Sequence, residues 1–167
     1  MKKLILADFH GTIVDANAAW HKAYCCLCPT QSDLIREKII AKENRSEIAK
    51  ALGLDYQEVI RLYRSFLSVR HEVIQIIKGL DLPIIIISNA SKERLLLDIE
   101  SVKGQHDLKF DKVYSGEDGK KPDTEYIERV IKENEYEFAY MIGNDAVEDF
   151  VKSPLVTNIL VPVTYFS

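Results

Sequence analysis

Five short apolar runs recur along the chain, and each predicts a β-strand. The runs are nearly continuous rather than alternating, as the four consecutive isoleucines at 84–87 illustrate. A strand that helices cover on both faces has this pattern, whereas a strand with one solvent face alternates between apolar and polar residues. The predicted strands cover residues 3–7, 83–88, 112–115, 138–143 and 157–161.

Amphipathic segments separate the later strands and predict helices over 91–102, 123–134 and 146–152. In the second of these segments, Tyr126, Val130 and Ile131 recur at the spacing of one helix face. Strands that alternate with helices form parallel crossover units. The pattern therefore predicts an α/β fold with a doubly wound, mostly parallel five-stranded sheet.

The segment between the first two strands has helical periodicity throughout and no strand pattern. A single crossover between parallel strands needs one helix. The pattern of this segment predicts five helices, over residues 18–27, 32–43, 46–52, 56–67 and 69–80. We therefore expect an all-helical insertion over residues 16–79, and an α/β core formed by residues 1–15 and 80–167.

Residues 46–59 also have the spacing of a helix-turn-helix, with Ala49, Gly53 and Val59 at the small, turn and packing positions. In a DNA-binding protein the second helix would contact the bases. Here that helix begins with Asp55 and Glu58, and the chain carries a net charge of −4. Because nucleic acids and anionic membranes attract basic surfaces, we favour a packing hairpin and expect no nucleic-acid partner.

The bulk composition is that of an ordinary domain. The 167 residues are 47% hydrophobic and 29% charged, which is enough to bury a core without disulfides. The apolar runs are too short to span a membrane, and Asp8 interrupts the N-terminal run too early for a signal peptide. We therefore expect a cytoplasmic protein with no membrane partner, and the pattern indicates no particular oligomeric state.

Three cysteines, Cys25, Cys26 and Cys28, cluster in the first predicted helix of the insertion. Cys25 and Cys28 have the CxxC spacing, and His21 lies four residues before Cys25, so a metal or redox site is one interpretation. However, no second pair of cysteines or histidines completes a tetrahedral set. We favour small side chains on a buried helix face.

Polar residues capable of phosphoryl chemistry follow the predicted strands. Asp8 follows the first strand, Ser88 ends the second, Lys121 precedes a helix start at Pro122, and Asp145 and Asp149 follow the fourth strand. The spacing of four predicts that the last two carboxylates share one face of a helix start. Singly, each residue has a structural explanation, such as a helix cap or a solvated lysine. Together they predict a phosphoryl and metal site, because open α/β sheets bind ligands at the carboxyl ends of their strands.

With these motifs the chain resembles the haloacid dehalogenase (HAD) superfamily. The four motifs of that family correspond here to Asp8-Phe9-His10-Gly11-Thr12, Ser88-Asn89-Ala90, Lys121-Pro122, and Gly143-Asn144-Asp145 through Asp149. The helical insertion also falls where members with a helical cap carry theirs. The resemblance implies a Rossmann-like core and a cap that closes over the active site and limits substrates to small molecules.

The resemblance also implies an activity, that of a Mg²⁺-dependent phosphohydrolase acting on a small phosphorylated metabolite. Asp8 would attack phosphorus and form an aspartyl-phosphate, and Lys121 would neutralise the negative charge around it. Thr12, Ser88 and Asn89 would bind the phosphoryl oxygens. Mg²⁺ would be held by the Asp8 carboxylate, the His10 backbone carbonyl and Asp145, with Asp149 supporting the site through water or an outer contact.

His10 stands where phosphatases of this superfamily typically have a second Asp, which protonates the leaving group and then activates water. Three hypotheses follow. His10 replaces that Asp as general acid and base; the enzyme is slow, because losing this group costs about 10²–10⁴-fold in rate; or the protein binds phosphate or a ligand in a regulatory role without turnover. Dehalogenases of the superfamily also lack the second Asp, but they typically carry Tyr there and need no metal, so Asp145 and Asp149 favour phosphoryl chemistry.

Overall fold

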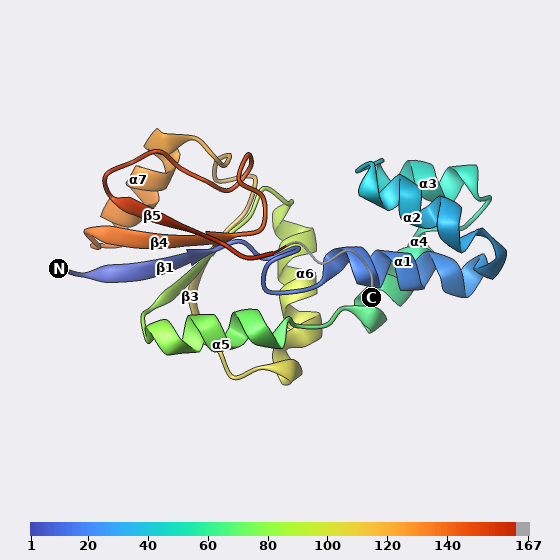
Figure 1. The fold of residues 1–167 in the computed structure, drawn as a ribbon, viewed down its shortest axis with the longest axis horizontal. Helices are drawn as coiled ribbons and strands as arrows, with labels where there is room; N and C mark the ends of the chain where they lie inside the picture. The colour runs from blue at the N-terminus through green and yellow to red at the C-terminus, as the bar shows by residue number, and fades with distance from the viewer. Residues whose placement is uncertain (163–167) are drawn as a thin grey trace. The chain divides into compact units, whose positions relative to one another are not determined.

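The computed structural model describes residues 1–162, and the chain divides into two compact units (Figure 1). Among the described residues, the first unit contains Met1–Val14 and residues 69–162, and the second contains the intervening residues from Asp15 to Ser68. The first unit is the α/β core, and the second consists of the inserted helices.

The core is built on a five-stranded sheet in the order β3-β2-β1-β4-β5. The strands are β1 (Lys3–Ala7), β2 (Ile84–Ile87), β3 (Phe110–Tyr114), β4 (Phe138–Gly143) and β5 (Val156–Leu160). Every neighbouring pair is parallel, with Ile5 of β1 opposite Ile84 of β2 and Tyr140 of β4. The predicted doubly wound α/β sheet is confirmed, and it is wholly rather than mostly parallel.

Helices cover both faces of this sheet: α5 (His71–Leu80) and α6 (Lys92–Val102) lie on one face and α7 (Thr124–Glu133) on the other (Figure 1). The short η2 turn (Lys103–Gln105) follows α6. The arrangement follows from right-handed crossovers, because the strand order runs one way from β1 to β3 and then returns past β1 to β4.

The continuous apolar strands fill both layers of the core. Alternate strand residues point to opposite faces, so Ile85 and Ile87 pack in the cluster that holds Ile127 and Val130 of α7. Ile84 and Ile86 are buried as well, and they point to the other face. This is why β2 consists of isoleucines only.

The boundary between the two units differs from the one expected at residue 79. The segment from Val69 to the end of α5 belongs to the core. The reason is that α5 is the crossover helix between β1 and β2, and it buries Val73, Ile74 and Ile77. The helical insertion is therefore shorter than predicted, and ends at Ser68.

The two ends of the insertion lie side by side. The backbone N–H of Asp15 donates to the Ser68 carbonyl at 3.0 Å, and Val14 and Val69 form an antiparallel bridge. The backbone N–H of Arg70 donates to Ile13 at 2.7 Å. The chain thus leaves the core and returns to it at one point.

The second unit contains α1 (Ala16–Leu27), the η1 turn (Pro29–Gln31), α2 (Ser32–Ile40), α3 (Arg45–Ala51) and α4 (Tyr56–Phe66). Its core combines aliphatic side chains with stacked aromatic ones: the rings of Trp20 and Tyr63 have centroids 4.0 Å apart. The hairpin of α3 and α4 corresponds to the segment with helix-turn-helix spacing. It buries Ile48, Ala49 and Val59.

Two expectations about local structure are wrong. Residues 146–152 form a turn instead of a helix, because the side chain of Asp149 accepts hydrogen bonds from the backbone N–H groups of Asn144 and Asp145. The cysteines do not lie on a buried face: Cys26 is exposed and Cys25 and Cys28 are partly exposed. The buried stripe of α1 consists of Ala16, Ala19 and Ala23 with Trp20 and Tyr24.

The metal interpretation of the cysteine cluster finds no support in the fold. All three cysteines are free thiols. Within residues 1–162, no group of three or more His, Cys, Asp or Glu side chains is placed to hold a metal ion. The same part of the chain contains no helix that is both long and apolar enough to cross a membrane.

Replacing Ile86 by Ala tests whether the central strand carries the core. Ile86 is fully buried in β2, so we expect Ile86→Ala to lower the free energy of unfolding by about 2–5 kcal/mol through lost burial and a cavity. Ile76→Ala on the exposed side of α5 is the control and should change it by less than about 0.5 kcal/mol. Urea denaturation measures both, and equal effects would contradict the assigned core.

Candidate active site

The loop after β1 places Asp8 at the carboxyl edge of the sheet, between β1 and β4. The backbone N–H of Asp8 donates to Ile142 of β4 at 2.9 Å, which extends the ladder between the two strands by one residue. The strand order reverses at β1, and such a reversal is where open α/β sheets form their ligand crevice. Asp8 is 8% exposed, so its carboxylate is largely withdrawn from water.

The rest of this loop folds tightly around the Phe9 carbonyl, which accepts hydrogen bonds from Thr12, Ile13 and Val14. Gly11 adopts a left-handed φ of 81°, and a Cβ there would lie 2.5 Å from the Asn144 side chain. A glycine is therefore required both by the backbone angle and by the approach of the β4 loop. The turn directs the Thr12 hydroxyl to Asp8 Oδ2 at 3.0 Å.

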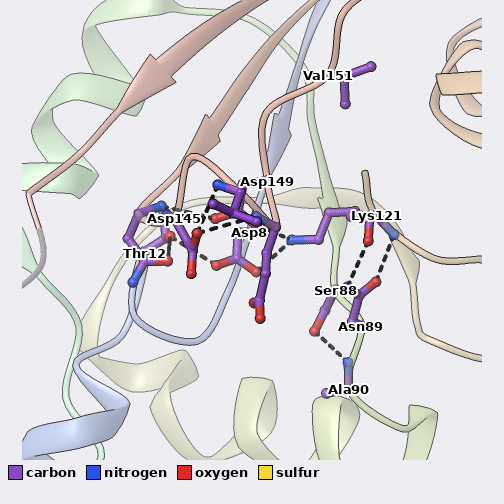
Figure 2. Close-up of polar contacts among 12 residues, drawn as sticks. Asp8, Thr12, Ser88, Asn89, Ala90, Lys121, Asp145, Asp149 and Val151 are labelled. Atoms are coloured by element: carbon purple, nitrogen blue, oxygen red, sulfur yellow. Dashed lines mark hydrogen bonds and ion pairs between the residues drawn. The ribbon is translucent and has the colours of Figure 1, made fainter. Parts of the chain in front are cut away.

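Lys121 joins the carboxylates of two loops (Figure 2). Its Nζ donates to Asp8 Oδ1 at 2.9 Å and to Asp149 Oδ1 at 2.7 Å. Lys121 is 6% exposed and Asp149 is 2% exposed, so this is a buried ion cluster rather than a surface salt bridge. The structure thus brings together three of the predicted residues by direct contact.

The loop after β4 supplies Asp145 and Asp149, but in different roles. Asp149 points inward, where it bonds Lys121 and two backbone N–H groups of its own turn. The side chain of Asp145 accepts from the backbone of Val147 and Glu148, and Figure 2 shows it beside Asp8 and Asp149. Gly143 makes this turn possible, because a Cβ there would lie 2.4 Å from the Asp149 side chain.

The loop after β2 supplies Ser88 and Asn89, which lie on the Lys121 side of the cluster (Figure 2). Ser88 is buried, and its Oγ accepts from the backbone N–H of Ala90 at 3.1 Å. The side chain of Asn89 binds both polar groups of the Lys121 backbone. Asn89 Oδ1 accepts a hydrogen bond from the Lys121 N–H at 2.8 Å, and Asn89 Nδ2 donates one to the Lys121 carbonyl at 3.2 Å. The Asn89 side chain thus positions the backbone of Lys121.

The imidazole of His10 lies against α6. Its Nε2 is 2.8 Å from Oδ2 of Asp98, a carboxylate with no exposed surface. Burial lowers the pKa of His10 below its ordinary value, and this outweighs the bond to Asp98, which raises it. The positive charge of Arg94 also lowers the pKa of His10. Burial and Arg94 thus act against the charged form of the ring, and Asp98 acts in its favour.

The buried cluster carries more negative than positive charge. Burial lowers the pKa of Lys121, but the charges of Asp8 and Asp149 raise it more, so the ammonium stays charged. Burial and the charge of Asp8 raise the pKa of Asp149 above its ordinary value, against the opposing effect of Lys121. One ammonium thus contacts two carboxylates, and the side chain of Asp145 lies beside them (Figure 2).

This charge excess suits a divalent cation. Mg²⁺ is typically held by one or two carboxylates, with water and substrate oxygens completing its six ligands. Asp8 and Asp145 provide two carboxylates, and each carboxylate oxygen that already accepts one hydrogen bond retains a further lone pair. The donor set of this site therefore fits Mg²⁺, although it does not form a cage made of protein side chains alone.

Two residues that contact the nucleophile loop were missed by the sequence analysis. The sequence gives a weak indication of Asp98, because this acidic residue has the helical spacing of the buried Leu95 and Val102. Nothing in the sequence pattern indicates Arg70, which is buried at the start of α5 and donates a hydrogen bond from Nη1 to the Gly11 carbonyl at 2.8 Å.

Comparison with known proteins identifies the class of fold. No family of related sequences matches the chain, and no curated protein matches it in sequence. Its structure matches those of HAD-like proteins, with a five-stranded parallel sheet flanked by helices. The chain therefore has the Rossmann-like fold of the HAD-like hydrolases.

Three solved structures illustrate the likeness. A hydrolase from Streptococcus pneumoniae TIGR4 aligns with a TM-score of 0.63 and 14% identity over 98% of this chain and 95% of that one. A candidate HAD-hydrolase of Bacillus subtilis, YfnB, whose structure is bound to magnesium, aligns with a TM-score of 0.61 and 19% identity. The alignment covers 89% of this chain and 82% of YfnB. The L-2-haloacid dehalogenase RSc1362 has a TM-score of 0.61 and 14% identity over 88% and 80%. At these identities the likeness establishes the fold.

Replacing Lys121 tests the buried ion cluster. Lys121→Met leaves Asp8 and Asp149 without their shared partner, so we expect the free energy of unfolding to fall by about 3–5 kcal/mol. Losing the lysine should also raise the pKa of Asp149 further. A carboxyl group whose pKa is raised by folding loses stability as the pH rises through that pKa, so the deficit should grow from acidic to neutral pH.

The control for this experiment is Lys120→Met, which removes an exposed lysine from the same loop. Denaturation curves of the three proteins at acidic and at neutral pH measure the effect. If Lys121→Met were as stable as Lys120→Met at neutral pH, the buried cluster would not be a stabilising element.

Proposed function

We propose that the protein is a Mg²⁺-dependent phosphohydrolase that acts through an aspartyl-phosphate on Asp8. The observation that carries the proposal is the contact of Lys121 Nζ with Asp8 Oδ1 at 2.9 Å, at the crevice of the sheet. A carboxylate fixed on one oxygen by an ammonium and on the other by the Thr12 hydroxyl is an oriented nucleophile. The magnesium-bound structure of the similar YfnB supports the choice of metal.

The reaction proceeds in two displacements. An Asp8 oxygen forms a bond to phosphorus while the bond to the substrate oxygen breaks, and His10 in its protonated form gives its proton to the departing alkoxide. A water molecule then attacks the phosphorus and gives a proton back to His10. The bond between Asp8 and phosphorus breaks, which releases phosphate and restores the carboxylate.

The surrounding residues provide charge and orientation. Lys121 offsets the negative charge that accumulates when a phosphoryl group approaches Asp8. Thr12 and Ser88 offer hydroxyl groups to the phosphoryl oxygens. Asp8, the His10 carbonyl and Asp145 would hold Mg²⁺, which when bound supplies further neutralisation of the phosphoryl oxygens, while Asp149 supports the site by fixing Lys121.

A small phosphorylated metabolite is the proposed substrate class. The support is the place of the helical unit in the chain: it is inserted directly after the nucleophile loop, between Val14 and Val69. Where an inserted unit closes over a reaction site, it excludes water and bulky substrates.

The second candidate function is a binding protein with little or no turnover. The burial that lowers the pKa of His10 favours it, because a leaving group must be protonated by an acid. Dehalogenation is a further alternative, and RSc1362 has a similar fold. It is separated from phosphatase activity by assaying halide release from 2-chloropropionate without metal.

Asp8→Asn tests the nucleophile. With p-nitrophenyl phosphate and Mg²⁺, the wild-type protein should release phosphate, and Asp8→Asn should reduce the rate to background because a neutral amide does not attack phosphorus. Asp111→Asn, which changes an exposed carboxylate on β3, is the matched control and should retain full activity. Turnover by Asp8→Asn at the wild-type rate would exclude the proposed covalent intermediate.

Substitution of His10 separates the enzyme from the binding protein. If His10 transfers protons, His10→Ala should lower kcat by about 10²–10⁴-fold. His10→Asp restores the residue usual in related phosphatases and should retain activity. Steady-state kinetics with p-nitrophenyl phosphate measure all three proteins. A wild-type rate at background together with an active His10→Asp would instead favour the binding protein.

A further inference from the structure

The carboxylate of Asp98 is buried where an apolar side chain would be expected. Asp98 lies between Leu95 and Val102 on the buried stripe of α6 and has no exposed surface. Burying a charged group costs free energy unless hydrogen bonds and opposite charges compensate it. Asp98 Oδ2 contacts His10 Nε2 at 2.8 Å and lies 3.6 Å from Arg94 Nε. The buried carboxylate of Asp98 is thus linked to the candidate site through its contact with His10.

The contact determines which nitrogen of His10 carries hydrogen. An ionised carboxylate only accepts hydrogen bonds, and the guanidinium of Arg94 nearby favours the ionised form of Asp98. Nε2 must therefore be the protonated nitrogen in this pair. In the neutral ring, Nδ1 is then the nitrogen with the free lone pair.

We propose that Asp98 is the positioning residue of His10, which it holds by the Nε2 bond so that Nδ1 exchanges protons with the leaving group and water. The inference rests on the proposed function, in which His10 moves those protons. The two residues are distant in sequence, yet the contact fixes the ring in one orientation and one tautomer. A carboxylate that orients a histidine in this way recurs in hydrolytic sites of unrelated folds.

The tautomer can be observed without any turnover. Long-range ¹H–¹⁵N spectra of protein labelled in its histidines should show His10 with hydrogen on Nε2, and His10→Gln identifies its signals. Asp98→Asn should change that tautomer, because the amide of Asn also offers a hydrogen-bond donor to Nε2. Glu100→Gln, an exposed change of carboxylate to amide on the same helix, should leave the His10 signals unchanged. A wild-type His10 with hydrogen on Nδ1 alone would overturn the proposal.

Kinetics test whether the orientation matters. Asp98→Asn should lower kcat for p-nitrophenyl phosphate by about 10–100-fold with KM unchanged, as loss of an orienting partner does elsewhere. Asp98→Glu, which keeps the carboxylate, should recover part of the loss. In a His10→Ala background, Asp98→Asn should have no further effect, because the two residues act as a unit.

Three kinetic outcomes would overturn the proposal. An equal loss in the presence and absence of His10 would show that Asp98 only stabilises the fold. An unchanged or higher kcat in Asp98→Asn would show that the bond is irrelevant or holds the ring away from the reaction. If the wild-type protein shows no turnover, the proposed function fails and the proton-transfer role of the pair fails with it, while the spectra still decide whether Asp98 fixes the tautomer.

Discussion

The candidate site depends on one buried ammonium group. Lys121 lies between Asp8 and Asp149, two carboxylates that come from different loops and would repel each other without it. Asn89 in turn holds the backbone of Lys121 at both of its polar groups. Lys121 therefore connects the loops that follow β1, β2 and β4. These contacts stabilise the carboxyl edge of the sheet.

The balance of charge around Lys121 connects the fold to the chemistry. The carboxylates outnumber the ammonium, so a phosphoryl dianion would be repelled unless another cation were present. A divalent metal bound at this crevice would supply that cation. At His10 two effects oppose each other, because burial lowers the pKa of the ring and the bond to Asp98 raises it.

The sequence predicted the parallel sheet and the edge at which the candidate residues meet. Continuous apolar runs indicated a sheet covered on both faces, and the shared edge of parallel strands brought Asp8, Ser88 and Lys121 together. It did not predict the turn at Asp149, because an acidic residue there suits a helix start as well as a side chain that caps its own loop. The pairing of His10 with Asp98 was equally hidden, since it depends on how α6 is rotated against the sheet.

The paired ends of the helical insertion have an evolutionary consequence. Because Asp15 and Ser68 are hydrogen-bonded to each other, the core needs only a tight connection at that point, whatever the chain contains between them. Such a junction allows one module to be lost, lengthened or exchanged without moving the strand ends that carry Asp8 and Ser88. The sheet edge and the inserted helices can therefore diversify at different rates.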